Sequence, residues 1–85
     1  MKVSLDPEAR QDLSEIQNEI REEIVENIED LKNHSLPEKS YVIRLPDGTE
    51  VQCLKLQEEN RNSDFNHRVT YDINGKQVRI YRCIP

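Results

Sequence analysis

Residues 67–84 read HRVTYDINGKQVRIYRCI, and this stretch decides the fold more clearly than any other part of the chain. Two runs of alternating polar and apolar residues flank Asn74-Gly75, the strongest short signal for a β-hairpin. A two-residue turn at this dipeptide sets the register of the two strands. The predicted pairs, stepping away from the turn, are Ile73 with Lys76, Asp72 with Gln77, Tyr71 with Val78, Thr70 with Arg79, Val69 with Ile80, Arg68 with Tyr81, and His67 with Arg82.

The two faces of this hairpin differ in chemistry because successive side chains of a strand point to opposite sides. One face is apolar enough to receive a helix, and it holds Val69, Tyr71, Ile73, Val78 and Ile80. The other face is polar and carries Arg68 and Arg79. We therefore expect a sheet with one buried face and one solvated face.

The preceding segment predicts two more strands, over residues 40–45 and 50–56, separated by the turn sequence Leu45-Pro46-Asp47-Gly48-Thr49. A polar loop follows over residues 58–66. If the 50–56 strand lies beside the hairpin, Lys55 points to the same side as Arg68. The polar face then gathers four candidates for binding, namely Lys55, Arg68, Arg79 and Tyr81.

This polar cluster has two interpretations. Arginine and lysine side chains bind phosphate oxygens, arginine with two parallel hydrogen bonds, and tyrosine stacks on a base or donates a hydrogen bond. The same residue types are also ordinary on the solvated face of an antiparallel sheet. The residues alone leave both interpretations open.

The N-terminal part is strand and then helix. Met1–Leu5 alternates and predicts a short strand, and Asp6-Pro7 supplies a good helix start. Residues 8–33 contain no Gly or Pro, and their apolar residues recur every three or four positions. That spacing fits one long helix, or a helical hairpin broken near Gln17-Asn18. The opposite, acidic face is either a solvated surface or a site for a partner.

Length and charge limit the possible architecture. Eighty-five residues suit a single domain over residues 1–85, and the order of elements predicts an α+β fold. The net charge is −5, but residues 1–35 hold ten acidic and four basic side chains, whereas residues 60–85 hold five basic and two acidic ones. The acidic average disfavours nucleic-acid binding, and the asymmetry leaves a basic end that suits a polyanion.

Other site chemistries find little support. Cys53 and Cys83 belong to no CxxC pattern, and His34 and His67 share no metal-ligand spacing. We expect free thiols, no metal and no cofactor. The sequence shows neither a signal peptide nor an apolar span of membrane length, so we expect a cytoplasmic protein without a membrane partner.

Three segments together resemble the RelE/ParE toxin family, which is the toxin half of type II toxin–antitoxin systems. Residues 5–13 (LDPEARQDL) resemble its opening strand-to-helix segment, and residues 20–31 resemble its second helix. Residues 67–73 with 78–81 resemble its "YRV-Y-I" strand and the strand that follows. The resemblance covers nearly the whole chain, and it implies a helical hairpin packed on one face of an antiparallel sheet.

The resemblance to RelE also implies an activity, which is metal-independent cleavage of mRNA on the ribosome with the RNA 2′-OH as nucleophile. It implies a helical, partly disordered antitoxin as partner. Arg68 matches the family's arginine at the scissile phosphate, and Lys55 matches a basic residue on the preceding strand. We expect both to be catalytic, with the further RNA-binding residues Arg79, Tyr81, Arg61 and Arg82.

The sequence also departs from the family pattern. Active members carry further basic and aromatic residues after the last strand, where this sequence reads Cys83-Ile84-Pro85, and Cys53 stands where a second lysine would suit the chemistry. We therefore expect attenuated catalysis. Two alternatives stay open: a ParE-like protein that binds DNA gyrase, and a non-catalytic interaction module of the same fold.

Overall fold

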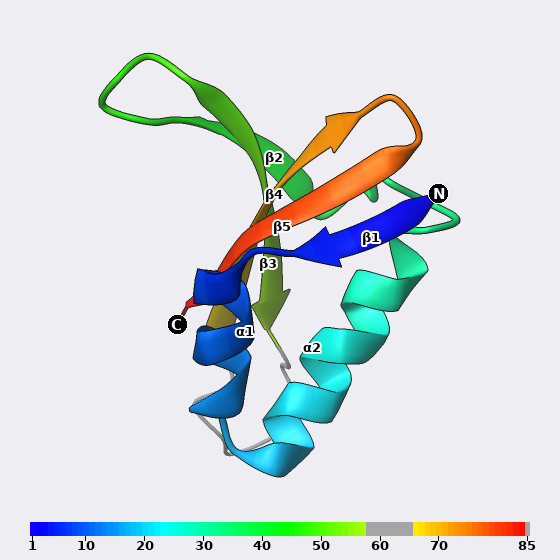
Figure 1. Cartoon of the computed structure of the whole chain (residues 1–85), viewed down its shortest axis with the longest axis vertical. Coiled ribbons are helices and arrows are strands. Elements are labelled where there is room, and N and C mark those ends of the chain that lie inside the picture. Colours follow the sequence, from blue (N-terminus) through cyan, green and yellow to red (C-terminus); the bar gives the residue numbers. More distant parts are fainter. Residues whose placement is uncertain (58–65, 85) are drawn as a thin grey trace.

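The computed structural model describes residues 1–57 and 66–84, which form two helices and a five-stranded sheet (Figure 1). The predicted α+β fold is confirmed, with strands in the spatial order β1-β5-β4-β3-β2. In chain order the elements are β1 (Lys2–Leu5), α1 (Pro7–Ser14), α2 (Asn18–Asp30), β2 (Ser40–Arg44), β3 (Glu50–Gln57), β4 (Asn66–Asn74) and β5 (Gln77–Ile84).

The helical region is a hairpin, as the family resemblance implied, and the alternative of one long helix is wrong. Gln17 has an extended backbone (φ −55°, ψ 142°) that separates α1 from α2. Pro7 occupies the start of α1, and the main-chain oxygen of Asp6 accepts the first helical hydrogen bond from Arg10 N at 3.0 Å. The Asp6 carboxylate makes no capping bond to the helix, because it binds Arg79.

The first strand joins the sheet in parallel. β1 pairs with β5, so that Val3 lies opposite Val78 and Leu5 opposite Ile80. The other strand pairs are antiparallel, as predicted, and the sheet as a whole is therefore mixed. β1 needs no tight turn to reach β5, since the rest of the domain lies between them in the sequence.

The β4–β5 turn differs from the prediction by one residue. Asn74 pairs with Gln77, so Gly75 and Lys76 form the turn, and Gly75 takes the positive φ (61°) that glycine adopts without strain. Ile73 consequently pairs with Val78 rather than Lys76. This shift moves the pairing by two positions along one strand, so each side chain between the turn and Ile80 stays on its predicted face.

A β-bulge at Tyr81 shifts the pairing by one further residue beyond Tyr71. Tyr71 pairs with Ile80, but the next residue of β4, Thr70, pairs with Arg82 and leaves Tyr81 as the extra residue. Beyond the bulge the face alternation of β5 is inverted. All seven predicted pairs are therefore wrong. The turn shift overturns those of Ile73 with Lys76, Asp72 with Gln77 and Tyr71 with Val78. The turn shift and the bulge together overturn those of Thr70 with Arg79, Val69 with Ile80, Arg68 with Tyr81 and His67 with Arg82.

The core lies between the helices and one face of the sheet, which we call the inner face. Ala9, Ile24, Ile28 and Leu31 of the helical region pack with side chains from β3, β4 and β5. Those sheet residues are Leu54, Leu56, Val69, Tyr71, Val78, Ile80 and Cys83. The opposite face, which we call the outer face, has no helix over it among the described residues.

Candidate nucleic-acid interface

Two basic side chains lie directly opposite each other on the outer face. Lys55 of β3 pairs with Arg68 of β4, and both are exposed. Like charges in cross-strand register destabilise a sheet. Within residues 1–57 and 66–84, neither side chain has a carboxylate partner to offset this repulsion. An anion between the two side chains would remove the repulsion, so the pair is suited to a phosphate.

A tyrosine that the sequence argument did not single out lies beside this pair. Tyr41 of β2 is the cross-strand partner of Cys53, which places it on the outer face. Its hydrogen bond with the Cys53 thiol raises the pKa of Tyr41, and the positive charge of Arg68 acts on it in the opposite direction. Tyr41 and Ile43 alternate in the predicted 40–45 strand. If that strand had been paired with the 50–56 strand in the sequence analysis, the pairing would have placed Tyr41 on the face of Lys55.

The bulge brings Arg82 to the outer face, where four strands form one continuous row. Tyr41 pairs with Cys53, Cys53 with Thr70, and Thr70 with Arg82. Lys55 and Arg68 occupy the neighbouring row two residues along β3 and β4. The structure thus gathers three of the predicted site residues, Lys55, Arg68 and Arg82, on adjacent rows of one surface.

Arg79 and Arg82 already bind carboxylates. Arg79 Nε and Nη2 donate to the two Asp6 oxygens at 2.8 and 3.1 Å, and Arg82 does the same to Asp12 at 2.7 and 3.1 Å. Each carboxylate raises the pKa of its arginine, and the hydrogen bond from Arg82 is the main cause that lowers the pKa of Asp12. Lys55 and Arg68 are therefore more accessible to a new anion than these two arginines.

Asp12 has a second role, which is to cover the open edge of β5. β1 pairs with residues 77–80 only, and Asp12 Oδ2 accepts a hydrogen bond from Cys83 N at 3.0 Å just beyond that pairing. The carboxylate thus satisfies a backbone donor that the short β1 cannot reach. Figure 1 shows the C-terminal end of β5 lying beside α1, which carries Asp12.

Comparison with known proteins bears on the fold. No family model and no curated protein matches the sequence. The structure matches a chain of the intact E. coli RelBE toxin–antitoxin complex with a TM-score of 0.71, over 98% of this chain and 93% of that chain. The chain therefore has a RelE-like fold. At 14% sequence identity the likeness establishes the fold, and the function of this chain is argued separately below.

Two predicted site residues, Tyr81 and Arg61, do not belong to the paired rows of the outer face. Tyr81 occupies the bulge, with the Arg79 guanidinium carbon 5.0 Å from the centre of its ring. This contact holds the ring beside the outer face. Arg61 falls in residues 58–65, outside the part of the chain that the structure describes.

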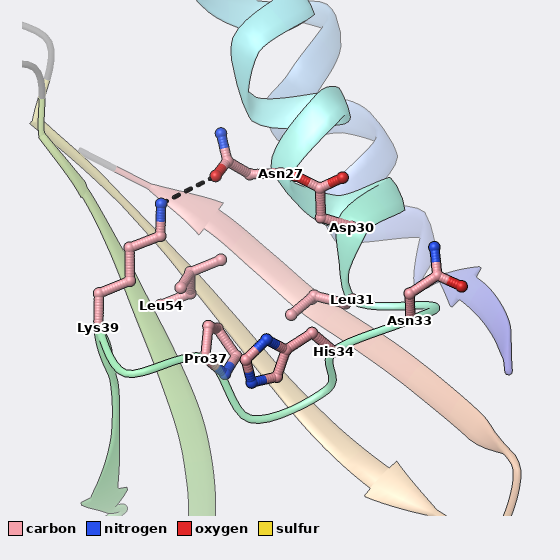
Figure 2. A pocket seen from close by; sticks show the side chains of 8 residues that line it. All are labelled: Asn27, Asp30, Leu31, Asn33, His34, Pro37, Lys39 and Leu54. Carbon is pink, nitrogen blue, oxygen red and sulfur yellow. Dashed lines mark hydrogen bonds between the residues drawn. The ribbon is translucent and has the colours of Figure 1, made fainter.

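A separate hollow lies on the helical side of the RelE-like fold (Figure 2). Its volume is about 320 Å³, and it is bordered by the end of α2, by residues 33–39 and by Leu54. Lys39 Nζ donates to Asn27 Oδ1 at 3.0 Å across its rim. None of the predicted RNA-binding residues lines it, so it does not contribute to the outer-face site.

Other site chemistries are not apparent in the described part of the chain. Over residues 1–57 and 66–84, no three His, Cys, Asp or Glu side chains are placed to hold a metal ion. No helix there has the length and apolar character to cross a membrane. Cys53 and Cys83 are both buried free thiols, and they lie on opposite faces of the sheet.

Proposed function

We propose that this chain is the toxin of a type II toxin–antitoxin pair and that it cleaves mRNA on the ribosome without a metal. The observation that carries the proposal is the exposed Lys55–Arg68 pair, two cations held in register without a described carboxylate partner. The RelE-like fold supports it by placing the pair on the sheet face that the helices leave open.

The chemistry needs few groups. The 2′-OH of one nucleotide attacks the adjacent phosphorus, and negative charge grows on the phosphate oxygens as the bond to the leaving 5′-oxygen breaks. We propose that Arg68 stabilises this charge with its guanidinium fork. Lys55 is proposed either to take the proton of the 2′-OH as a neutral amine and return it to the leaving 5′-oxygen, or to add positive charge beside the phosphate while water carries that proton. Arg79, Tyr81, Arg82 and Arg61 are proposed to contact RNA farther along the strand.

Attenuated activity is part of the proposal. Cys53 is two residues from Lys55 on the same face, but it is buried and hydrogen-bonds with Tyr41. It supplies no positive charge to the site. Arg79 and Arg82 must also exchange carboxylates for phosphates before they can contribute, so we expect slow cleavage rather than none.

The proposed partners follow from the same reasoning. They are the ribosome with its mRNA and a cognate antitoxin that is helical and partly disordered in its free form. The matched structure is a toxin–antitoxin complex, which supports the second of these. We propose that the protein acts in the cytoplasm, where ribosomes are found.

Cell-free translation with the purified protein tests the function, and primer extension maps new 5′ ends on the message. We expect discrete cuts that disappear with Arg68→Ala and weaken as salt rises. Arg44→Ala is the matched control. Arg44 is an exposed arginine of the same sheet that pairs with Glu50 and points to the other face.

The outcomes separate the alternatives. Cuts that persist in Arg68→Ala would show that the site is elsewhere. An intact message with undiminished translation would reject the nuclease, and a DNA supercoiling assay would then distinguish a gyrase-binding protein from a non-catalytic module.

A further inference from the structure

The outer face contains a hollow, lined in part by Tyr81 and Arg82, that takes no part in the proposed bond cleavage at Lys55 and Arg68. Its volume is about 310 Å³, near the lower limit of typical small-ligand pockets (about 300–1,000 Å³). The turn between β2 and β3 forms one wall, and β5 forms the other. Its lining includes Leu45, Thr49, Val51, Thr70 and Tyr81.

Much of this lining is apolar even though no described helix covers it. Val51 is only 6% exposed, and its strand position places it on the outer face with Lys55. Leu45 is 38% exposed at the rim. Apolar side chains that form a concave surface away from the core are a feature of binding sites rather than of ordinary solvated sheet faces.

The walls of the hollow are held in place by local contacts. Leu45 N donates to Thr49 O at 2.7 Å, and Asp47 Oδ1 accepts from Thr49 N at 2.9 Å. That backbone hydrogen bond lowers the pKa of Asp47, so the carboxylate at the rim is ionised near neutral pH. On the other wall, Arg79 stacks on Tyr81. The hollow is thus largely formed before any ligand arrives.

The position of the hollow indicates the chemistry of its ligand. Thr70, on its floor, lies two residues along β4 from Arg68, which corresponds to about 7 Å between their Cα atoms. An apolar slot beside two cations that have no carboxylate partner among the described residues suits a ligand with a flat apolar body and an anionic arm. A nucleotide has both, since each base has a π-face that stacks on tyrosine or packs on aliphatic groups.

We propose that this hollow is a subsite for one unpaired base of an RNA strand whose phosphate lies between Lys55 and Arg68. The proposal rests on the proposed function for the identity of its polyanion. Because the walls are mainly apolar, the subsite accepts different bases. Asp47, at its rim, accepts a hydrogen bond from a base amino group that reaches it.

Binding of two short RNA probes tests the proposal without a ribosome. One probe is a single-stranded trinucleotide, and the other is the same ribose–phosphate chain without bases, so the two carry equal charge. The methyl NMR signals of Leu45 and Val51 report on the hollow, in low salt. We expect the base-containing probe to shift these signals and to bind about ten times more tightly than the abasic one.

Substitutions at the rim give the controls. Leu45→Ala and Tyr81→Ala should each remove most of the difference between the probes. Val42→Ala should leave the difference between the two probes unchanged. Val42 is an exposed aliphatic residue of β2, and its side chain points to the opposite face of the sheet from the hollow.

Each outcome has a distinct meaning. Equal affinity for the two probes, or shifts confined to residues outside the hollow, would overturn the base subsite and leave the proposed cleavage at Arg68 standing. Binding of neither probe would overturn the subsite as well. Tight base-dependent binding by a protein that makes no cuts in translation would support the subsite and reject the nuclease.

Discussion

Replacing Lys55 with glutamate should make the protein more stable and abolish its proposed activity. Lys55 and Arg68 are exposed and directly opposite, and a like-charge pair in this position costs about 0.2–1 kcal/mol. Lys55→Glu removes that repulsion and substitutes an attraction of similar size. The free energy of unfolding should therefore rise by about 1 kcal/mol. For a domain of this length, that corresponds to an increase in Tm of roughly 4–8 °C.

Thermal unfolding followed by circular dichroism, at low and high salt, measures this effect. The gain should shrink at 1 M salt, where the Debye length is about 3 Å. Arg44→Glu is the matched control, because it changes the net charge equally but places a second carboxylate opposite Glu50. It should lower Tm. A Lys55→Glu variant that is no more stable than the parent at low salt would refute the idea that the pair is electrostatically strained.

Three further predictions concern the core and its titratable groups. Burial lowers the pKa of His67, so as the pH falls the imidazole takes up a proton in the unfolded state before it does so in the folded state. The free energy of unfolding should therefore decrease as pH falls below about 6.5. Urea titrations of the parent and of His67→Gln should show a shallower decrease in the variant. Burial raises the pKa of Cys83 to about 12, so a thiol reagent at pH 8 should modify it only after denaturant is added, and rapid modification of the native protein would contradict the structure. Ile24→Ala should cost about 2–5 kcal/mol in urea unfolding because Ile24 is fully buried, whereas Val25→Ala, at a position that is 39% exposed, should cost far less.

The sequence predicted the strands and their faces well because period-two alternation is strong in β3, β4 and β5. It predicted the turn at Asn74-Gly75 but misplaced it by one residue, since Gly75 satisfies either turn by supplying a positive φ. The face assignments survived as far as the bulge because the true register there differs by two positions. The break between the helices was ambiguous, because apolar spacing continues through Gln17 without a Gly or Pro to mark it.

The arrangement of the candidate site residues could be predicted in part, and their remaining contacts depend on tertiary structure. Lys55 and Arg68 could be brought together from alternation alone. The bulge at Tyr81 could not be foreseen, because no glycine or proline marks it, and it decides which face Arg82 occupies. The pairs of Arg79 with Asp6 and Arg82 with Asp12 join residues that are 73 and 70 positions apart, a separation at which no local pattern operates.

The parallel pairing of β1 with β5 has a consequence for how the protein is made. The first strand has no partner in the sheet until residues 77–80 have been synthesised. The carboxylates of Asp6 and Asp12 likewise cannot pair with Arg79 and Arg82 before those arginines have been added. Contacts of such high sequence separation form late, since the intervening loop must close first. The sheet therefore closes only after residues 77–80 have left the exit tunnel. Until then the nascent chain lacks its closed sheet, and under the proposed function it is inactive toward the ribosome that makes it.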